Sequence, residues 1–439
     1  MNVSVIGTGY VGLSTGVCLA EIGHQVTCID IDKSKIEKLN KGISPIYEPG
    51  LERFLQKNIN TKRLSFTTCY EEGLIGSDII VMTVGTPQGP EGKPDLSYLE
   101  RAAVDIASHL NEDTIIVIKS TVPVGTNNHI KEIIDKHIAD DIKVDIVSNP
   151  EFLREGSAIV DTLKADRIIL GSNKPSAIAK VKELYSTLNI PILETDISSA
   201  EMIKYASNAF LALKISYINE IANLCELVGA DVMDVSKGMG MDRRIGESFL
   251  RPGIGYGGSC FPKDVLALQH SARDAGMTFD LLSETMHINN LQQLVLIEKA
   301  KNRFGELKDM NFAVLGLAFK PGTDDIREAP SITIIQELIK SEAYVATFDP
   351  AASNNMEQVI NHDNVNYCTS LYEAVENADA LFIITEWDEI ISMDLFQVLS
   401  LMKQPVIFDG RNCLKEEQLL ECEKIEYYPI GRPNLLRRS

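Results

Sequence analysis

One cysteine stands in a setting that suits nucleophilic chemistry. Cys260 lies in the stretch GIGYGGSCFPKD, residues 253–264, where three glycines precede it closely and would let the backbone approach a ligand. Pro262 suits the first position of a helix, and Asp264 suits its first turn. Cys260 would then lie at a helix N-terminus beside Lys263, and both features favour the nucleophilic thiolate. The alternative is a structural cysteine in a glycine-rich turn.

A second glycine-rich turn, near the N-terminus, has the pattern of a dinucleotide-binding site. An apolar run, Val3 to Ile6, meets the sequence GTGYVG, a helical stretch follows, and a second strand, Gln25 to Ile29, ends at Asp30. Within the turn, one glycine permits the bend, one lets backbone approach a pyrophosphate, and one lets the helix pack against the sheet. The free N–H groups at the helix start would bind the phosphates. The predicted cofactor-binding residues of this turn are Gly7, Gly9, Tyr10, Val11 and Gly12.

The acid at the end of the second strand indicates which cofactor is used. Asp30 would accept hydrogen bonds from the adenosine ribose and would repel a 2′-phosphate, which predicts NAD rather than NADP. Lys35 lies five residues further on, where it could reach a phosphate or remain a solvated lysine. Thr86 ends a later strand, where a doubly wound fold places ligand contacts.

A nucleophilic thiol together with an NAD site narrows the reaction. Simple alcohol dehydrogenation needs a base and leaves a thiol without a task. Oxidation of an aldehyde to an acid does use a thiol, because a thiohemiacetal gives up hydride and the resulting thioester hydrolyses. The two motifs therefore predict an oxidoreductase whose product is a carboxylic acid.

Other polar residues occur where such a reaction would need them. Lys204 and Asn208 are four residues apart on a predicted helix, so they share one face and could stabilise an oxyanion. Two exposed residues on a solvated face are the alternative. Glu151 follows a strand and could handle protons during hydrolysis. Further candidates lie at strand ends and in loops, at Thr121, Arg154, Glu155, Lys320 and Arg327.

The elements that must position these residues alternate between strands and helices in the first part of the chain. Strands are expected at Val3–Ile6, Gln25–Ile29, Ile79–Val84, Ile115–Ile118, Val144–Val147 and Arg167–Leu170. Helical patterns lie between them. This alternation predicts a parallel sheet with helices on both faces.

The pattern changes near residue 195. One long helix is expected from Ser198 to about Gly229, with Ser198 and Glu201 spaced as a capping box at its start. Mostly helical sequence continues to Phe304, and alternation returns with a strand at Phe312–Leu315. The predicted fold is α/β, with two Rossmann-like doubly wound domains joined by a helical central domain. The expected boundaries are 1–197, 198–304 and 305–439.

Composition excludes several classes of partner. The chain has 439 residues, with 42 Lys plus Arg against 62 Asp plus Glu, hence a formal charge of 42 − 62 = −20. Such a charge repels nucleic acid and anionic lipid, so any anionic substrate must bind through local cations. No apolar run approaches the ~20 residues of a membrane span. The eight cysteines form no CxxC pair and no metal-ligand spacing with histidine, so no metal site and a cytosolic location are expected.

These motifs together resemble the UDP-glucose 6-dehydrogenase family. They occur along essentially the whole chain in the family's order: GTGYVG, KSTVPVG, NPEFLREGSA, EMIKYASNAF, RIGESFLRPGIGYGGSCFPKD and GLAFKPGTDDIREAP. The resemblance implies an NAD domain, a helical middle that forms a homodimer, and a C-terminal domain that holds UDP. It also implies oxidation of UDP-glucose to UDP-glucuronate with two NAD per turnover.

The resemblance also implies roles for individual residues. Cys260 matches the nucleophile, Lys204 and Asn208 the groups that hold the reacting oxygen, and Asp264 and Thr121 those that organise water and protons. Glu151 matches the carboxylate tied to thioester hydrolysis. Implied cofactor contacts are Lys35, Thr86, Thr121, Glu155, Lys263 and Arg327. Implied substrate contacts are Glu151, Phe152, Leu153, Arg154, Glu155, Lys204, Asn208, Phe249, Leu250, Arg251, Pro252, Gly253, Gly257 and Lys320, with Arg244 reaching the neighbouring subunit's substrate.

Three alternatives remain beside this interpretation. The same chemistry could act on GDP-mannose or a UDP-N-acetylhexosamine. An ordinary two-electron hydroxyacid dehydrogenase would leave Cys260 without a task. A non-catalytic, NAD-responsive binding protein would be expected to have lost the thiol or the Lys204–Asn208 pair, and the sequence retains both.

Overall fold

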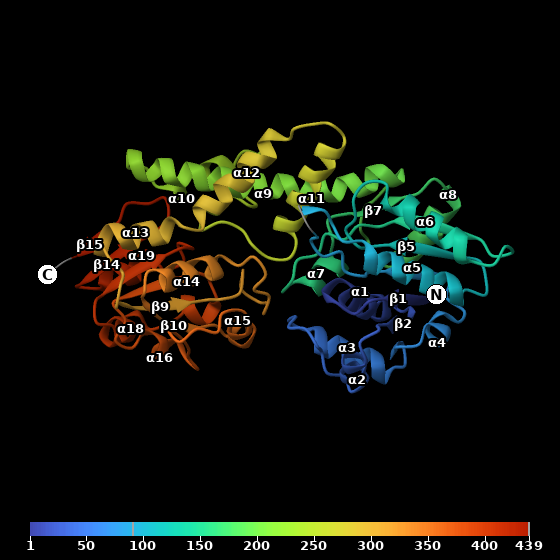
Figure 1. The fold of residues 1–439 in the computed structure, drawn as a ribbon, viewed down its shortest axis with the longest axis horizontal. Helices are drawn as coiled ribbons and strands as arrows, with labels where there is room; N and C mark the ends of the chain where they lie inside the picture. The colour runs from blue at the N-terminus through green and yellow to red at the C-terminus, as the bar shows by residue number, and fades with distance from the viewer. Residues whose placement is uncertain (90–91, 438–439) are drawn as a thin grey trace. The chain divides into compact units, whose positions relative to one another are not determined.

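Two mostly parallel sheets, each flanked by helices, form the framework of the protein (Figure 1). The computed structural model describes residues 1–89 and 92–437. Their contacts divide the chain into two compact units. The first unit comprises residues 1–207 and 266–277, and the second comprises residues 208–265 and the chain from Thr278 onward. The fold class predicted from the sequence is confirmed.

The sheet of the first unit has eight strands in the order β3-β2-β1-β4-β5-β6-β7-β8. The strands are β1 (Asn2–Ile6), β2 (Gln25–Ile29), β3 (Leu64–Thr67), β4 (Ile79–Met82), β5 (Thr114–Ile118), β6 (Val144–Ser148), β7 (Ile168–Gly171) and β8 (Ile192–Thr195). All neighbours are parallel except β6 and β7, which pair antiparallel at Ser148 and Gly171. The strand order reverses between β1 and β4, and ligands bind at the carboxyl ends of the strands at such a switch point.

Helices cover both faces of this sheet. They are α1 (Tyr10–Glu21), α2 (Lys33–Asn40), α3 (Leu51–Asn60), α4 (Tyr70–Leu74), α5 (Ser97–His109), α6 (Thr126–His137), α7 (Ala158–Leu163) and α8 (Pro175–Leu184). Ile79 and Val81 of β4 belong to one buried cluster, and Ile80 and Met82 to another. Because successive strand residues point to opposite faces, an apolar run in β4 supplies both cores.

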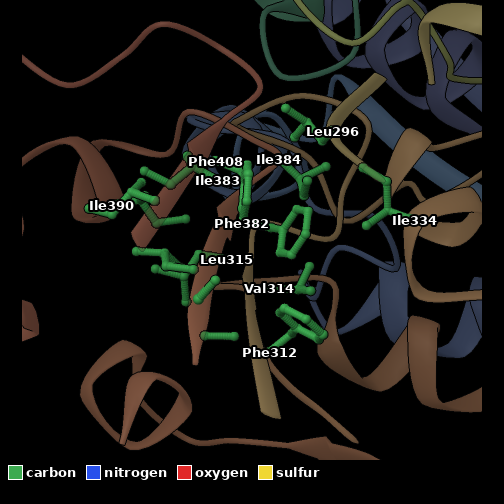
Figure 2. Packing of buried hydrophobic residues seen from close by; sticks show 14 of the residues in the cluster. Leu296, Phe312, Val314, Leu315, Ile334, Phe382, Ile383, Ile384, Ile390 and Phe408 are labelled. Carbon is green, nitrogen blue, oxygen red and sulfur yellow. The ribbon is translucent and has the colours of Figure 1, made fainter. Parts of the chain in front are cut away.

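The sheet of the second unit has seven strands in the order β11-β10-β9-β12-β13-β14-β15. The strands are β9 (Asn311–Leu315), β10 (Tyr344–Phe348), β11 (Val365–Tyr367), β12 (Ala380–Ile383), β13 (Val406–Asp409), β14 (Ile425–Tyr428) and β15 (Leu435–Arg437), the last antiparallel to β14. Figure 2 shows the core of this unit, where Phe312, Phe382 and Phe408 follow one another across the sheet. The ring centroids of Phe382 and Phe408 are 4.9 Å apart.

The remaining helices are α10 (Val232–Gly240), α12 (Asp280–Gln292), α13 (Val295–Phe304), α14 (Pro330–Lys340), α15 (Ser353–Val359), α16 (Leu371–Val375), α17 (Asp388–Ile391), α18 (Leu395–Leu401) and α19 (Glu416–Glu421). Two further helices continue from one unit into the other: α9 (Ile197–Val228), of 32 residues, and α11 (Phe261–Asp274). The long helix expected after residue 195 is therefore confirmed.

The predicted capping box of the long helix is wrong. Asp196 caps α9, because its carboxylate accepts from the Ser199 N–H at 2.9 Å and the Ser199 hydroxyl at 2.6 Å. Glu201 instead accepts from the N–H groups of Gly125 and Asn127, at 2.7 and 2.8 Å. Those donors belong to the start of α6, where free N–H groups attract a carboxylate more strongly than a single N–H at the start of α9.

Within residues 1–89 and 92–437, every helix is too short or too polar to cross a bilayer. The same residues contain no group of three or more His, Cys, Asp or Glu side chains arranged to hold a metal ion. No disulfide bond joins any two of the eight cysteines, all of which lie in the described residues.

Candidate active site

The turn after β1 has the geometry of a pyrophosphate cradle. Gly7 has φ +96°, and its N–H donates to Ile29 O at 2.8 Å. A Cβ on Gly12 would lie 2.1 Å from Gly7 O, so only glycine lets α1 pack this close. A Cβ on Gly9 would meet no protein atom within 4 Å. The backbone at Gly9 is therefore open on the side where the N-terminus of α1 offers free N–H groups, and the turn fits a dinucleotide.

Asp30 has a structural task besides the predicted ribose contact. One carboxylate oxygen accepts from the N–H and the hydroxyl of Thr8, at 2.8 and 2.7 Å, and the other accepts from the Asp32 N–H at 3.0 Å. A carboxylate accepts about four hydrogen bonds. Asp30 can therefore hold the turn and still accept one more donor.

The other predicted cofactor contacts of this unit lie at the same end of the strands. The Thr86 hydroxyl donates to Thr121 O at 2.8 Å, so the structure brings these two residues together. Both are buried. Lys35 lies half-buried in the first turn of α2.

Lys204 and Glu151 form a buried ion pair. The Lys204 ammonium lies 2.9 Å from Glu151 Oε1, and the side chains are only 4% and 5% exposed. Glu151 Oε2 accepts from the Leu153 N–H at 2.7 Å. The Phe152 ring lies 5.4 Å from Lys204 Nζ and 4.1 Å from the centre of the Arg167 guanidinium. A solvated surface position for Lys204 is therefore excluded.

The segment that follows Glu151 is held at its far end by two acids. Arg154 donates from its backbone N–H and its guanidinium to Asp161, at 2.8 to 2.9 Å. Glu48 accepts from the N–H groups of Gly156 and Ala158 at the start of α7, at 2.7 and 2.8 Å. Glu155, between these anchors, is buried. The predicted substrate segment 151–155 is thus fixed at both ends.

In the second unit, Cys260 immediately precedes α11. Its carbonyl accepts from the Asp264 N–H at 2.9 Å, so it caps the helix as expected, although the first helical residue is Phe261 and not Pro262. The thiol is partly exposed and lies 3.5 Å from the Ser259 hydroxyl. The Lys263 ammonium lies 2.6 Å from Asp264 Oδ1.

Asp264 is the centre of a buried polar group beside this thiol. The carboxylate is 1% exposed and accepts from Asn208 Nδ2 at 2.6 Å and from Lys263. A buried carboxylate needs such partners to remain charged. Asn208 is 6% exposed, so the solvated-face alternative is excluded for it as well.

The glycines before Cys260 accommodate the chain's own backbone. A Cβ on Gly257 would lie 2.1 Å from Glu328 O, and one on Gly258 would lie 2.6 Å from the Phe319 ring. The Gly258 N–H donates to Arg327 O at 2.8 Å. The close approach that the sequence suggested for a ligand is therefore made here by residues 319–328.

The remaining predicted substrate contacts also belong to the second unit. Gly253 is buried, and its N–H donates to Asn219 Oδ1 at 2.8 Å. Phe249 has φ +64° and packs against Phe261, with ring centroids 6.0 Å apart. Leu250 and Pro252, which lie between Phe249 and Gly253 in the sequence, are also buried. Arg244 is 89% exposed and pairs with Asp242.

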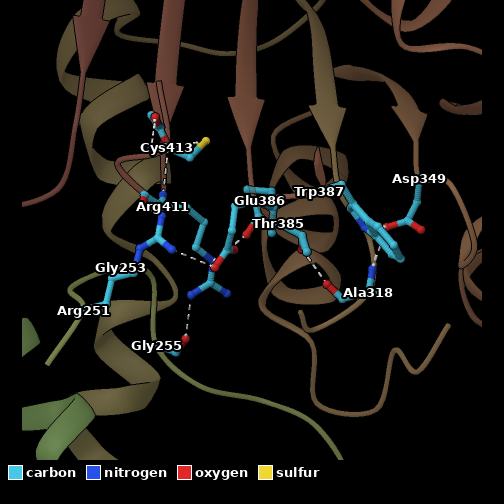
Figure 3. A network of polar contacts seen from close by, with 12 residues as sticks. Arg251, Gly253, Gly255, Ala318, Asp349, Thr385, Glu386, Trp387, Arg411 and Cys413 are labelled. Carbon is cyan, nitrogen blue, oxygen red and sulfur yellow. Dashed lines mark hydrogen bonds and ion pairs between the residues drawn. The ribbon is translucent and has the colours of Figure 1, made fainter. Parts of the chain in front are cut away.

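Arginines gather around one carboxylate in this unit (Figure 3). Glu386 lies 3.6 Å from Arg251 and 3.5 Å from Arg411, and Arg411 also donates to Ile384 O at 2.7 Å. Asp409 is a second carboxylate of this network and accepts from the Arg411 N–H at 2.9 Å. Arg327, by contrast, is neutralised by Asp325 at 2.6 Å, and Lys320 lies 5.3 Å from the Phe319 ring.

The second unit repeats the turn geometry of the first but uses its acid differently. Gly316 has φ +90°, and its N–H donates to Phe348 O at 2.9 Å, as Gly7 does to Ile29 O. Asp349 takes the place of Asp30. It accepts from five N–H groups, those of Leu317, Ala318, Ala351, Ala352 and the Trp387 indole. Figure 3 shows the indole lying against Asp349, which has no acceptor left for a ribose.

Sequence reasoning missed several residues that hold the predicted site residues in place. Glu48 and Asp161 fix the 151–155 segment, and Lys119 and Asn149 lie buried beside it. For Lys119 there was a readable signal, since a lysine directly follows the apolar strand β5 in the sequence IIVIKST. For Glu48, no local pattern indicated a partner more than a hundred residues away.

Known proteins share the sequence and the fold of this chain. Three models of the UDP-glucose/GDP-mannose dehydrogenase family match: the NAD binding domain at residues 1–189, the central domain at 198–291 and the UDP binding domain at 313–416. UDP-glucose 6-dehydrogenase YwqF of Bacillus subtilis is 52% identical, with 98% of each chain covered. Similar solved structures include a UDP-glucose dehydrogenase from Pyrobaculum islandicum (TM-score 0.92, 35% identical, 98% of each chain covered). Another is a UDP-D-ManNAc dehydrogenase from Pyrococcus horikoshii (TM-score 0.87, 30% identical, 98% of this chain and 99% of that chain covered).

The fold and the first glycine turn are those of a dinucleotide-binding α/β protein. The chain belongs to the UDP-glucose/GDP-mannose dehydrogenase family. It is therefore an oxidoreductase, and its cofactor is NAD.

Proposed function

We propose that this protein oxidises UDP-glucose to UDP-glucuronate through a thioester on Cys260. Conversion of the sugar CH₂OH to a carboxylate removes four electrons and adds one oxygen atom, which comes from water. NAD, when bound, accepts each pair of electrons as hydride, so two NAD are consumed per sugar. The relatives named as UDP-glucose dehydrogenases support this substrate.

The residues of the chain divide the chemistry between them. The Cys260 thiolate adds to the aldehyde carbon, and the oxygen becomes the alkoxide of a thiohemiacetal. Lys204 and Asn208 hold that oxygen, which stabilises the charge that develops on it. Loss of hydride leaves a thioester. Glu151 takes a proton from the attacking water, and the sulfur leaves as the thiolate as the carboxylate forms.

The observation that carries the proposal is the surroundings of Asp264. A fully buried carboxylate in the first turn of α11 is bonded to Asn208 and Lys263, one turn after the cysteine that starts the helix. Burying such a carboxylate is costly, which is typical of a functional site. A helix N-terminus also favours a thiolate over a thiol.

Two arginines of the second unit support an anionic substrate. In a molecule of formal charge −20, a diphosphate must bind through local cations. Arg251 and Arg411 supply two guanidinium groups, whose paired N–H donors suit phosphate oxygens. These donors favour a nucleotide sugar over a small neutral alcohol.

The test is the yield of NADH per acid formed, measured with UDP-glucose, GDP-mannose and UDP-N-acetylhexosamines. We expect two NADH per UDP-glucuronate and no free aldehyde. Activity with GDP-mannose alone would overturn the substrate assignment. One NADH per turnover with release of an aldehyde or ketone would overturn the four-electron reaction.

Cys260→Ser tests the thioester separately. This variant should bind NAD normally and lose nearly all acid formation, because a hydroxyl is a far weaker nucleophile than a thiolate. Cys69→Ser, at another partly exposed thiol, is the matched control. A Cys260→Ala enzyme that releases acid at near the wild-type rate would exclude the covalent mechanism.

A further inference from the structure

We propose that Lys119 is a positioning residue for the Glu151–Lys204 ion pair, and that its ammonium continues to balance the charge of Glu151 when Lys204 turns to the reacting oxygen. Lys119 follows β5 and is 9% exposed. This role rests on the proposed function, because that function gives Lys204 an oxygen to hold.

Lys119 is tied to the segment that carries Glu151. Its ammonium donates to Asn149 Oδ1 at 3.3 Å, and Glu151 follows two residues later. Asn149 is itself held by three further hydrogen bonds. It donates from Nδ2 to Ile169 O and from its backbone to Ile118 O, both at 2.9 Å, and accepts from the Tyr185 hydroxyl at 2.6 Å. This network fixes the place of the ammonium beside the start of the 151–155 segment.

An ammonium has three donors. Among the described residues, Asn149 Oδ1 is the one hydrogen-bond acceptor of Lys119, and it is shared with Tyr185. A buried cation with so few partners is costly unless a nearby carboxylate compensates it. Glu151 is that carboxylate, because its negative charge raises the pKa of Lys119 whereas burial lowers it.

Two buried cations therefore share one carboxylate. Lys204 contacts Glu151 directly, whereas Lys119 acts on it from the end of β5. If Lys204 alone balanced Glu151, turning its ammonium toward the substrate would leave a buried carboxylate without a cation. Lys119 removes this conflict because it can stay with Glu151 while Lys204 acts on the oxygen.

Among the described residues, the charged and titratable groups facing Lys119 are Glu151, Lys204, Cys18 of α1 and Tyr185, whose hydroxyl shares Asn149 Oδ1 with Lys119. Burial raises the pKa of Tyr185, so its hydroxyl stays neutral in the mildly alkaline range. Burial lowers the pKa of Lys119 to about 8, with Glu151 raising it and Lys204 lowering it. Burial raises the pKa of Cys18 to about 12, so this thiol carries no charge near pH 8. Lys119 is thus charged at neutral pH and loses its proton in the mildly alkaline range.

The first experiment compares kcat, KM and pH profiles of Lys119→Met and Lys119→Arg with UDP-glucose. Lys119→Met should lower kcat by about 10²-fold, the scale expected when a reacting group is misplaced, and leave the KM for NAD unchanged. Wild-type kcat should fall above about pH 8. Arginine keeps its charge there, so Lys119→Arg should recover most of kcat and move the alkaline limb upward.

Lys174→Met is the matched control, since Lys174 belongs to the same unit, pairs with Asp145 and is 61% exposed. It should keep the wild-type rate and profile. A Lys119→Met enzyme with the wild-type kcat and alkaline limb would overturn the proposal.

A second measurement needs no activity. The folded-state pKa of Lys119 lies below that of an unfolded lysine, about 10.4. Between about pH 8 and 10 the unfolded chain binds more protons, so the wild type should gain stability over Lys119→Met as pH rises. Urea unfolding of both proteins at pH 7, 8, 9 and 10 measures this difference. If the stability difference between the two proteins does not change with pH, the buried ammonium of Lys119 is excluded, whether or not the enzyme is active. Inactivity on every nucleotide sugar would overturn the proposed function and not this measurement.

Discussion

Asp30 holds the first glycine turn through its carboxylate. It accepts two hydrogen bonds from Thr8 and is the acid expected to meet the ribose. Asp30→Ala should therefore weaken NAD binding, reduce the preference for NAD over NADP, and lower the melting temperature of the protein. Titration of both cofactors and thermal unfolding measure these effects.

The matched control for this variant is Asp78→Ala. Asp78 also accepts a backbone N–H, that of Asn2 at 2.9 Å, but at the amino end of the strands. Its loss should lower stability and leave the affinity for both cofactors unchanged. If Asp30→Ala also kept its affinity for NAD and NADP, the ribose acid would lie elsewhere.

Residue types and spacing predicted the glycine turn, the acid after β2 and the cysteine at a helix start, because each depends on neighbours within about thirty residues. The actual partner of each charged side chain was less predictable. Lys263 was expected beside the thiol, and its pair with the adjacent Asp264 was not foreseen. Asp264 is 1% exposed, so its carboxylate needs a cation, which residue spacing does not indicate.

Among the helices, α6 depends on a residue of another helix for its N-terminal cap. Glu201 of α9 is 2% exposed and accepts from Gly125 and Asn127. Glu201→Ala would leave these buried donors unpaired, so we expect a loss of about 1–3 kcal/mol in the free energy of unfolding. Urea denaturation measures it.

Glu194→Ala serves as the control for Glu201, because Glu194 forms an exposed pair with Lys182, with side chains 47% and 45% exposed. Exposed pairs contribute at most about 1 kcal/mol. Equal losses in the two variants would contradict a capping role for Glu201.

Most elements followed from periodicity alone. The expected strand Gln25–Ile29 and the long helix agree with β2 and α9 to within a residue. The cap of α9 did not follow, because local spacing cannot reveal that the N-terminus of α6, over seventy residues earlier in the chain, competes for Glu201. The antiparallel pair of β6 and β7 was hidden for the same reason, since strand direction depends on the path of the connection.

At the scale of the whole molecule, α9 leaves one apolar face uncovered. Phe210, Tyr217 and Leu224 are spaced by seven residues and are 62%, 47% and 53% exposed, and Leu227 is 85% exposed. Residues seven apart lie on the same side of a helix, and such exposed patches mark interaction surfaces. We propose that a second copy of the chain covers this face, as the family resemblance implies.

Leu224→Glu combined with Leu227→Glu should therefore convert a dimer to monomers, since a charge in an apolar interface is costly. Analytical ultracentrifugation measures the mass. The control is Leu420→Glu on α19, where the side chain is 49% exposed. A wild-type protein that sediments as a monomer would contradict this interface.

The two-sheet architecture was predictable because each half of the chain alternates strands and helices. The division into compact units was not. The first unit takes residues 266–277 from the far side of the segment 208–265, which belongs to the second. Leu266, in this later segment, packs closely against Gly92 of the same unit. A Cβ on Gly92 would lie 3.1 Å from the Cβ of Leu266.

This discontinuity sets an order of events on the ribosome. A nascent chain emerges from its N-terminus, and domains usually fold as soon as their residues are available. Here the first sheet is complete once residue 195 has emerged, yet the part of α11 that packs against Gly92 comes some seventy residues later. During that interval the segment 208–265 must emerge without its own sheet, which begins at residue 311. The first unit therefore stays incomplete until residues 266–277 have been synthesised, which happens after the first residues of the second unit have emerged.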